Sequence, residues 1–154
     1  MIIYRLMRAT DSLKVHALIN TNLDGFFSLD TIEYFISLWP QGQFVAEDLF
    51  GNIHGALIGS QLANGRANIS LFAVDLGSRG QGVGSKLYEM FRTQCYMQGY
   101  SEIQLELRVE NVNAFNFYSK RGFQVTERID SLYGPGEDGI RMVSRLNPIN
   151  HASS

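Results

Sequence analysis

The sequence predicts a mixed α/β fold: a central, mostly antiparallel sheet that contains one parallel βαβ unit and is flanked by helices. Two observations lead to this prediction. Residues 44–47, 53–62 and 67–74 form three apolar runs separated by turn-forming residues, a pattern typical of consecutive antiparallel strands. After them, a glycine-rich turn, a helical pattern over residues 82–98 and a strand pattern over residues 102–109 indicate a right-handed βαβ crossover.

Two helices are expected before the antiparallel runs. Asp11 is placed to cap the first of them. The second begins near Ser28 to Asp30, where Asp30 and Glu33 have the spacing of a capping box, and Pro40 ends it. Apolar residues recur at helical spacing in both segments: Val15, Leu18 and Ile19 in the first, and Ile32, Phe35, Ile36 and Trp39 in the second. We expect Trp39 to anchor the core.

The ends of the chain add further elements. Residues 2–8 are expected to form a first strand, and residues 112–120 a short helix after the crossover. Residues 123–129 and 140–146 then read as a second hairpin around the turn at residues 133–136. These elements complete the predicted fold.

Length and composition favour one folded domain. The chain has 154 residues, of which 45% are hydrophobic and 18% charged, enough apolar material for one core. We therefore expect a single domain over residues 1–146 and a flexible C-terminal tail over residues 147–154.

Charge and cysteine content exclude several function classes. The net charge is -2, and its 13 Lys+Arg residues form no dense basic run, so nucleic acid is not an expected partner. No apolar stretch of 18 residues and no leader pattern occurs, which predicts a cytoplasmic protein without a membrane partner. Cys95 is the one cysteine, so we expect a buried thiol and neither a disulfide framework nor a metal site.

The glycine-rich turn is the first candidate functional motif. It lies between a strand that ends at Val74 and a helix that starts near Gly82. Glycines let backbone N–H groups approach a ligand closely, and a helix N-terminus carries partial positive charge, so the turn suits a pyrophosphate. A tight strand-to-helix connection without a ligand is the alternative that the residues alone leave open.

The turn resembles the Q/R-x-x-G-x-G/A signature of the GNAT superfamily of acetyltransferases. The resemblance implies a GNAT fold and acetyl-CoA as cofactor. It implies that the pyrophosphate is held by the turn and that the pantetheine arm lies along the preceding strand. The implied contacts are Ala73 and Val74 along the arm, and Arg79, Gly80, Gln81, Gly82, Val83, Gly84 and Ser85 at the pyrophosphate.

A second candidate motif lies on the strand over residues 102–109. Strand alternation puts Glu106 and Arg108 on one face, opposite the apolar residues. Charge on a strand covered from both sides is costly to bury, so this face needs either a functional role or a compensating partner. The residues alone favour compensation, by an i, i+2 ion pair between Glu106 and Arg108 at a partly wet sheet edge.

Residues 105–123 resemble the L-E-V-R-x-S-N-x-x-A-x-x-L-Y-x-x-x-G-F region of bacterial ribosomal-protein alanine acetyltransferases and archaeal N-terminal acetyltransferases. The resemblance implies that Glu106 is the general base and Tyr118, twelve residues later, the general acid. It also implies that Asn111 contacts the cofactor. A packing role for Tyr118 is the alternative.

A third resemblance concerns the substrate. Trp39-Pro40, residues 44–48 and the turn at residues 136–139 are similar to segments of the catalytic subunits that acetylate protein N-termini. Those enzymes often carry two adjacent tyrosines before this turn, whereas this chain has Leu132-Tyr133. Several of them also place a glutamate in the loop between the first two helices. In this chain Asp24 replaces that glutamate, or the role is absent. The implied peptide contacts are Asp24, Phe26, Phe27 and Tyr133.

The sequence thus predicts acetyl transfer to the α-amino group of protein N-termini, by direct attack in a ternary complex. An auxiliary subunit or a homodimer is an expected partner. Two alternatives stay open: a GNAT enzyme that acts on a small amine or on lysine, and an acyl-CoA-binding module without catalysis.

Overall fold

The structure is a computed structural model, and it describes residues 1–146; the expected tail over residues 147–154 lies outside the described residues. Within residues 1–146 the strands form one seven-stranded sheet in the order β1-β2-β3-β4-β5-β7-β6. The strands are β1 (Ile2–Leu6), β2 (Gln43–Asp48), β3 (Ile53–Gln61), β4 (Ala67–Val74), β5 (Glu102–Arg108), β6 (Gln124–Ile129) and β7 (Gly139–Arg145). The helices are α1 (Ser12–Asn22), α2 (Leu29–Leu38), α3 (Val83–Met97) and α4 (Val112–Ser119), with 3-10 turns η1 (Ala9–Asp11), η2 (Pro40–Gly42) and η3 (Leu76–Ser78).

This topology confirms the predicted mixed fold. β1 to β4 pair antiparallel in sequence order, β4 and β5 form the parallel pair, and α3 is the crossover between them. β7 lies between β5 and β6, so the last strand of the chain pairs with the crossover strand. Local periodicity did not predict that insertion.

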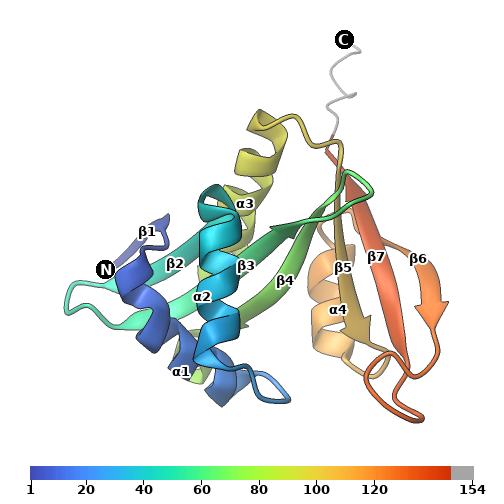
Figure 1. The fold of residues 1–154 in the computed structure, drawn as a ribbon, viewed down its shortest axis with the longest axis horizontal. Coiled ribbons are helices and arrows are strands. Elements are labelled where there is room, and N and C mark those ends of the chain that lie inside the picture. Colours follow the sequence, from blue (N-terminus) through green and yellow to red (C-terminus); the bar gives the residue numbers. More distant parts are fainter. Residues whose placement is uncertain (147–154) are drawn as a thin grey trace.

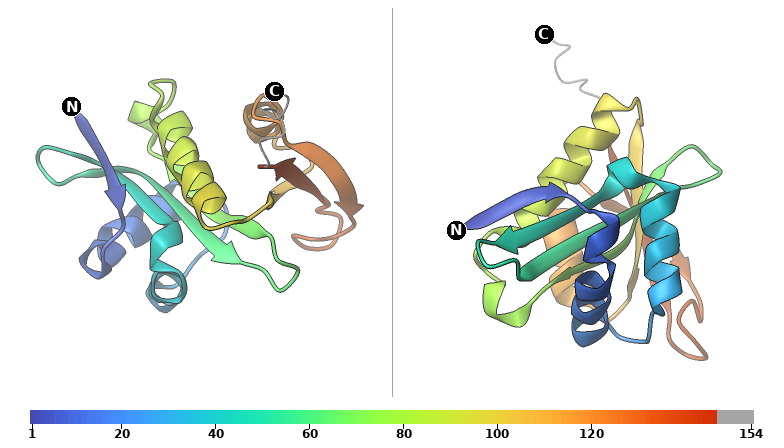
Figure 2. Two further views of the ribbon diagram at one scale, coloured as in Figure 1. Left: turned by 90° about the horizontal axis from the view of Figure 1, so that it is seen from above. Right: turned by 60° about the vertical axis from the view of Figure 1, so that its left-hand side comes forward.

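The helices cover the sheet from both sides (Figures 1 and 2). α1 and α2 pack on one face over a core that includes Ile19, Ile32 and Ile58. α3 and α4 pack on the other face, where Trp39 and Cys95 are buried as predicted. Burial raises the pKa of the Cys95 thiol to about 12, which keeps it protonated. No helix within residues 1–146 combines the length and the apolar character that crossing a membrane requires.

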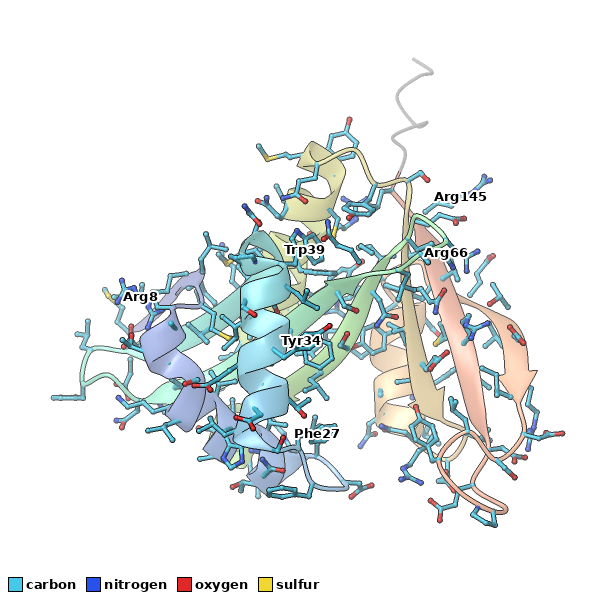
Figure 3. All side chains as sticks on the ribbon, viewed as in Figure 1. Arg8, Phe27, Tyr34, Trp39, Arg66 and Arg145 are labelled. Atoms are coloured by element: carbon cyan, nitrogen blue, oxygen red, sulfur yellow. The ribbon has the colours of Figure 1, made fainter. Side chains whose placement is uncertain are left out.

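Both predicted helix starts need a correction in their caps. Asp11 precedes α1, but its carboxylate accepts hydrogen bonds from the Arg5 guanidinium and the Arg8 backbone instead of capping α1. The Arg5 guanidinium makes two charged hydrogen bonds to this carboxylate, and these are stronger than a hydrogen bond from a neutral N–H of the helix. For α2 the cap is Ser28, whose hydroxyl accepts from the Thr31 backbone. Figure 3 shows Phe27 ahead of the start of α2 and Trp39 beyond its end.

β4 and β5 separate after a short paired segment. Their pairing consists of Ala67 with Ile103 and Asn68 with Gln104. Directly beyond, the register of β3 against β4 shifts between Ile58 and Gly59, and a bulge of this kind increases local strand twist. The two strands then diverge toward their carboxyl ends (Figure 1). The β5-facing edge of β4 is therefore left without a neighbouring strand over its second half.

Candidate functional site

A cavity of about 740 Å³ lies beside this free edge of β4. Its walls come from the end of α1, the second half of β4, the glycine-rich turn, the start of α3, and α4. The predicted cofactor residues that line it are Ala73, Val74, Arg79, Gly80, Gly82, Gly84, Ser85 and Asn111, and Tyr118 lines it as well. Gln81 and Val83 are not among its lining residues; Val83 is buried beneath the turn.

The turn presents backbone N–H groups at the start of α3. Gly80 and Gly82 adopt left-handed conformations, with φ of 81° and 84°, which a side chain rarely tolerates. Gly82 is the N-cap of α3, so the free N–H groups of the first helical turn and the positive end of the helix dipole point toward the cavity. This geometry suits a bound phosphate or pyrophosphate.

The free edge of β4 suits an extended ligand that carries amides. Backbone N–H and C=O groups on an unpaired strand edge need partners, and a ligand in the position of an added strand supplies them. Ala73 and Val74 belong to this edge and line the cavity. The turn and the strand edge together therefore form one continuous site for a long ligand with a diphosphate at one end.

Two arginines connect the turn to its surroundings. Arg79 donates from Nε to the Val74 carbonyl at 3.0 Å and from Nη2 to Asn22 Oδ1 at 3.0 Å, so it joins the turn to the end of α1. Arg121, which the sequence interpretation missed, donates to the Ser85 hydroxyl and stacks on the Phe117 ring at 3.6 Å. It places a cation at the first turn of α3. The position of Arg121 just after α4 in the sequence did not indicate that its side chain would contact α3.

Glu106 lies outside the lining of the cavity, on the sheet face that carries α1 and α2. Leu105 and Leu107 point into the core beneath α3 and α4, so Glu106 points the other way. Arg141 of β7 is its cross-strand neighbour and donates to Glu106 Oε2 at 2.8 Å. The expected alternative, an ion pair of Glu106 with Arg108, is not formed; the cross-strand residue is the partner.

Tyr118 is buried and lines the cavity from α4. Its ring packs edge-on against Phe117 and Phe123. Burial raises the pKa of Tyr118 well above its ordinary value, because the phenolate would lose its hydration. The hydroxyl therefore keeps its proton at neutral pH.

The candidate substrate residues fall into two groups. Asp24 and Tyr133 meet at Arg108: Asp24 Oδ2 lies 3.8 Å from Arg108 Nε, and the guanidinium lies 4.6 Å from the centre of the Tyr133 ring. Phe26 instead packs edge-on against His16 at 5.9 Å. Phe27 packs against the core beneath α1 and α2. The structure thus brings Asp24 and Tyr133 together at Arg108 and places the two phenylalanines elsewhere.

His54 of β3 connects the β2–β3 turn to the start of the glycine-rich turn through hydrogen bonds with two aspartates. Its ring nitrogens lie 2.8 Å from Asp48 Oδ2 and 2.7 Å from Asp75 Oδ2, and Asp75 in turn accepts from the Ser78 backbone as the cap of η3. Hydrogen bonds to Asp48 and then to Asp75 raise the pKa of His54 above its ordinary value. When it is protonated, the imidazolium donates to both carboxylates and connects β3 to the start of the glycine-rich turn.

We expect the hydrogen bonds of His54 with Asp48 and Asp75 to contribute less to stability as the pH rises. Because the pKa of His54 is higher in the folded than in the unfolded chain, its contribution to stability is complete below about pH 6.5 and is lost as the pH rises through the folded-state pKa. Urea unfolding between about pH 6 and pH 9 should show a wild-type advantage over His54→Gln that shrinks with pH. A difference in the free energy of unfolding that is constant across this range would contradict a stabilising role of the protonated His54.

The chain is similar to a family model, to curated proteins and to solved structures. A model of the acetyltransferase (GNAT) family matches residues 13–123. N-alpha-acetyltransferase 30 of Schizosaccharomyces pombe is 31% identical over 129 residues, covering 82% of this chain and 86% of that protein. The structure of Ard1 from Thermoplasma volcanium is similar with a TM-score of 0.89 at 29% identity, over 95% of this chain and 98% of that chain. A chain of the NatC complex bound to Gag peptide and CoA is similar with a TM-score of 0.86 at 25% identity, over 95% and 99%.

Proposed function

Because the chain belongs to the acetyltransferase (GNAT) family, we propose that it transfers an acetyl group from acetyl-CoA to the α-amino group of protein N-termini. The observation that carries the proposal is the separation of β4 from β5, which leaves a free strand edge beside the cavity. The similarity to N-alpha-acetyltransferase 30 supports the N-terminal substrate. Similarity to a chain of the NatC complex supports an auxiliary subunit as partner, with a homodimer as the alternative.

The described residues fit acetyl-CoA. A pyrophosphate needs backbone donors and positive potential, which the Gly80–Gly82 turn and the start of α3 provide. An amide-bearing arm needs an unpaired strand edge, which Ala73 and Val74 provide. When bound, acetyl-CoA would supply the thioester carbonyl that an amine attacks.

The two proton transfers belong to side chains on opposite faces of the sheet, Glu106 on one and Tyr118 on the other. Glu106 takes a proton from the incoming amine, directly or through water, as the new C–N bond forms. Free N–H groups on the edge of β4 polarise the carbonyl in the manner of an oxyanion hole. Tyr118 gives its proton to the thiolate sulfur as the C–S bond breaks, and its raised pKa keeps that proton available.

The chemistry of the amine favours an N-terminus over lysine. An α-amino group with a pKa of about 8 is roughly 10% neutral at pH 7, whereas a lysine side chain with a pKa of about 10.4 is neutral less than about 0.1% of the time. Only the neutral amine attacks a carbonyl. A site with one carboxylate base therefore accepts N-termini more readily than lysines.

The test is an acetylation assay with the purified chain, acetyl-CoA and short lysine-containing peptides of varied first residue. Each peptide is supplied both with a free and with a blocked N-terminus, and products are identified by mass spectrometry. We expect one acetyl group on the free N-terminus and none on the blocked peptide. Acetylation confined to lysine or to small amines would overturn the proposal.

The glycine turn gives a direct test of the cofactor site. Gly82→Ala puts a side chain at a φ of 84°, which costs about 1–2 kcal/mol although the space is open. If the turn relaxes, its N–H groups move, and we expect acetyl-CoA affinity to fall by about tenfold, which corresponds to about 1.4 kcal/mol. Calorimetry measures the affinity.

Gly65→Ala is the matched control for this variant. Gly65 lies in the turn between β3 and β4, with a φ of 86° and equally open space, and it does not line the cavity. Both variants should lose similar stability in urea, and only Gly82→Ala should lose affinity. Equal acetyl-CoA affinity in the two variants would remove the turn from the cofactor site.

A further inference from the structure

We propose that Arg108 is a positioning residue for the peptide, which links the α1–α2 loop (residues 23–28) to the β6–β7 loop (residues 130–138) at the end of β5, two residues from Glu106. This inference rests on the proposed function. It names a residue that sets peptide affinity without touching the reacting atoms.

Arg108 contacts both loops at once. Its guanidinium pairs with Glu137 and stacks on the Tyr133 ring, both in the β6–β7 loop. From the other side, Asp24 of the α1–α2 loop lies 3.8 Å from Nε. The two loops are distant in sequence. One side chain at the end of β5 therefore connects two separate segments, both of which carry peptide contacts implied by the family resemblance.

The position of Arg108 on β5 directs these loops toward Glu106. The two residues share a strand face at a spacing of about 6.7 Å, two strand residues apart. The Tyr133 ring lies against Gly139, the cross-strand partner of Arg108, two residues along β7 from the partner of Glu106. Partial burial, and then the charge of Glu106, raise the pKa of Tyr133. Arg108 therefore holds Tyr133 beside the residue that would receive the proton of the amine.

The β6–β7 loop is preformed, whereas the contact with the α1–α2 loop is weak. Within the β6–β7 loop, the Tyr133 backbone N–H donates to the Glu137 carbonyl at 3.0 Å, and a Cβ added to Gly139 would lie 2.9 Å from the Tyr133 ring. Asp24, in contrast, is 85% exposed in its side chain, and its pair with Arg108 is long.

These contacts predict a separation of kinetic effects. Arg108→Gln keeps length and polarity but loses the charge that binds Asp24 and Glu137 and the cation that stacks on Tyr133. We expect the peptide KM to rise by about tenfold, with kcat and the KM for acetyl-CoA changed by less than about threefold. Arg108→Lys retains the charge and should recover part of the peptide affinity.

Arg128→Gln is the matched control. Arg128 pairs with Asp138 at 2.7 Å, so this change also removes an arginine–carboxylate pair from the β6–β7 hairpin, but not the residue that contacts Asp24. We expect a peptide KM near that of the wild type. In addition, Asp24→Asn should raise the peptide KM in the wild type and have little further effect in Arg108→Gln, because the two residues act through one contact.

The outcomes separate the two proposals. A wild type that acetylates no peptide would overturn the proposed function. A wild type that acetylates peptides while folded Arg108→Gln has the same peptide KM would overturn the role of Arg108 alone. Equal increases in Arg108→Gln and Arg128→Gln, accompanied by equal losses of stability in urea, would also overturn it, since they would indicate a general effect on the hairpin.

Discussion

Replacing Glu106 by glutamine is expected to lower kcat by about 10² to 10⁴, the usual contribution of a positioned acid or base. The amide preserves the size of the side chain but cannot accept the proton of the amine. Acetyl-CoA affinity should stay near that of the wild type, because Glu106 does not line the cavity. Raising the pH above about 8, where an α-amino group is largely neutral, should restore part of the rate.

Glu127→Gln separates the catalytic role of Glu106 from its ion pair. Arg141 donates to both Glu106 and Glu127, so each variant removes one carboxylate from the same guanidinium. Partly exposed pairs of this kind contribute about 0.2–1 kcal/mol, so similar small losses of stability are expected in both. Steady-state kinetics should show the loss of kcat in Glu106→Gln alone. A normal kcat in folded Glu106→Gln, or an equal loss in both variants, would rule out the base.

Local sequence patterns were sufficient to predict the elements that line the cavity beside β4. Gly99 and Gly122 adopt a φ of 89° and 88° directly after α3 and α4, as helix-ending glycines do. The left-handed Gly82 likewise marks the start of α3. Such glycines identify the ends of helices because their backbone conformation excludes most other residues. The cavity follows from the order of strand, turn and helix.

The surroundings of Glu106 could not be predicted in this way. Residues at i and i+2 of a strand are about 6.7 Å apart, whereas directly opposed residues on neighbouring strands are about 5 Å apart. Which residue opposes Glu106 depends on the insertion of β7 beside β5, and this placement makes Arg141 the partner. Strand order is decided by tertiary packing, which a single sequence does not display. The contacts of Arg108 with two distant loops were hidden for the same reason.

Tyr118→Phe is expected to lower kcat by about 10² to 10⁴, with acetyl-CoA affinity retained. The change removes the hydroxyl and leaves the ring in its packing against Phe117 and Phe123. Because burial raises the pKa of Tyr118, the wild-type acid should keep its proton throughout about pH 6 to 9, and no fall in kcat from its ionisation is expected there. Single-turnover kinetics with saturating peptide would measure the chemical step.

Tyr88→Phe is the control that removes a neighbouring buried hydroxyl. Tyr88 packs on Phe117 and Phe123 from α3 and is not among the residues that line the cavity. Its hydroxyl is buried without a hydrogen-bond partner among residues 1–146. Removing an unsatisfied buried hydroxyl should leave stability unchanged or increase it, and kcat should be normal. Loss of kcat in Tyr118→Phe alone therefore identifies a proton donor. A Tyr118→Phe enzyme as fast as Tyr88→Phe would instead mean that water protonates the thiolate, and that Tyr118 contributes packing to the cavity wall.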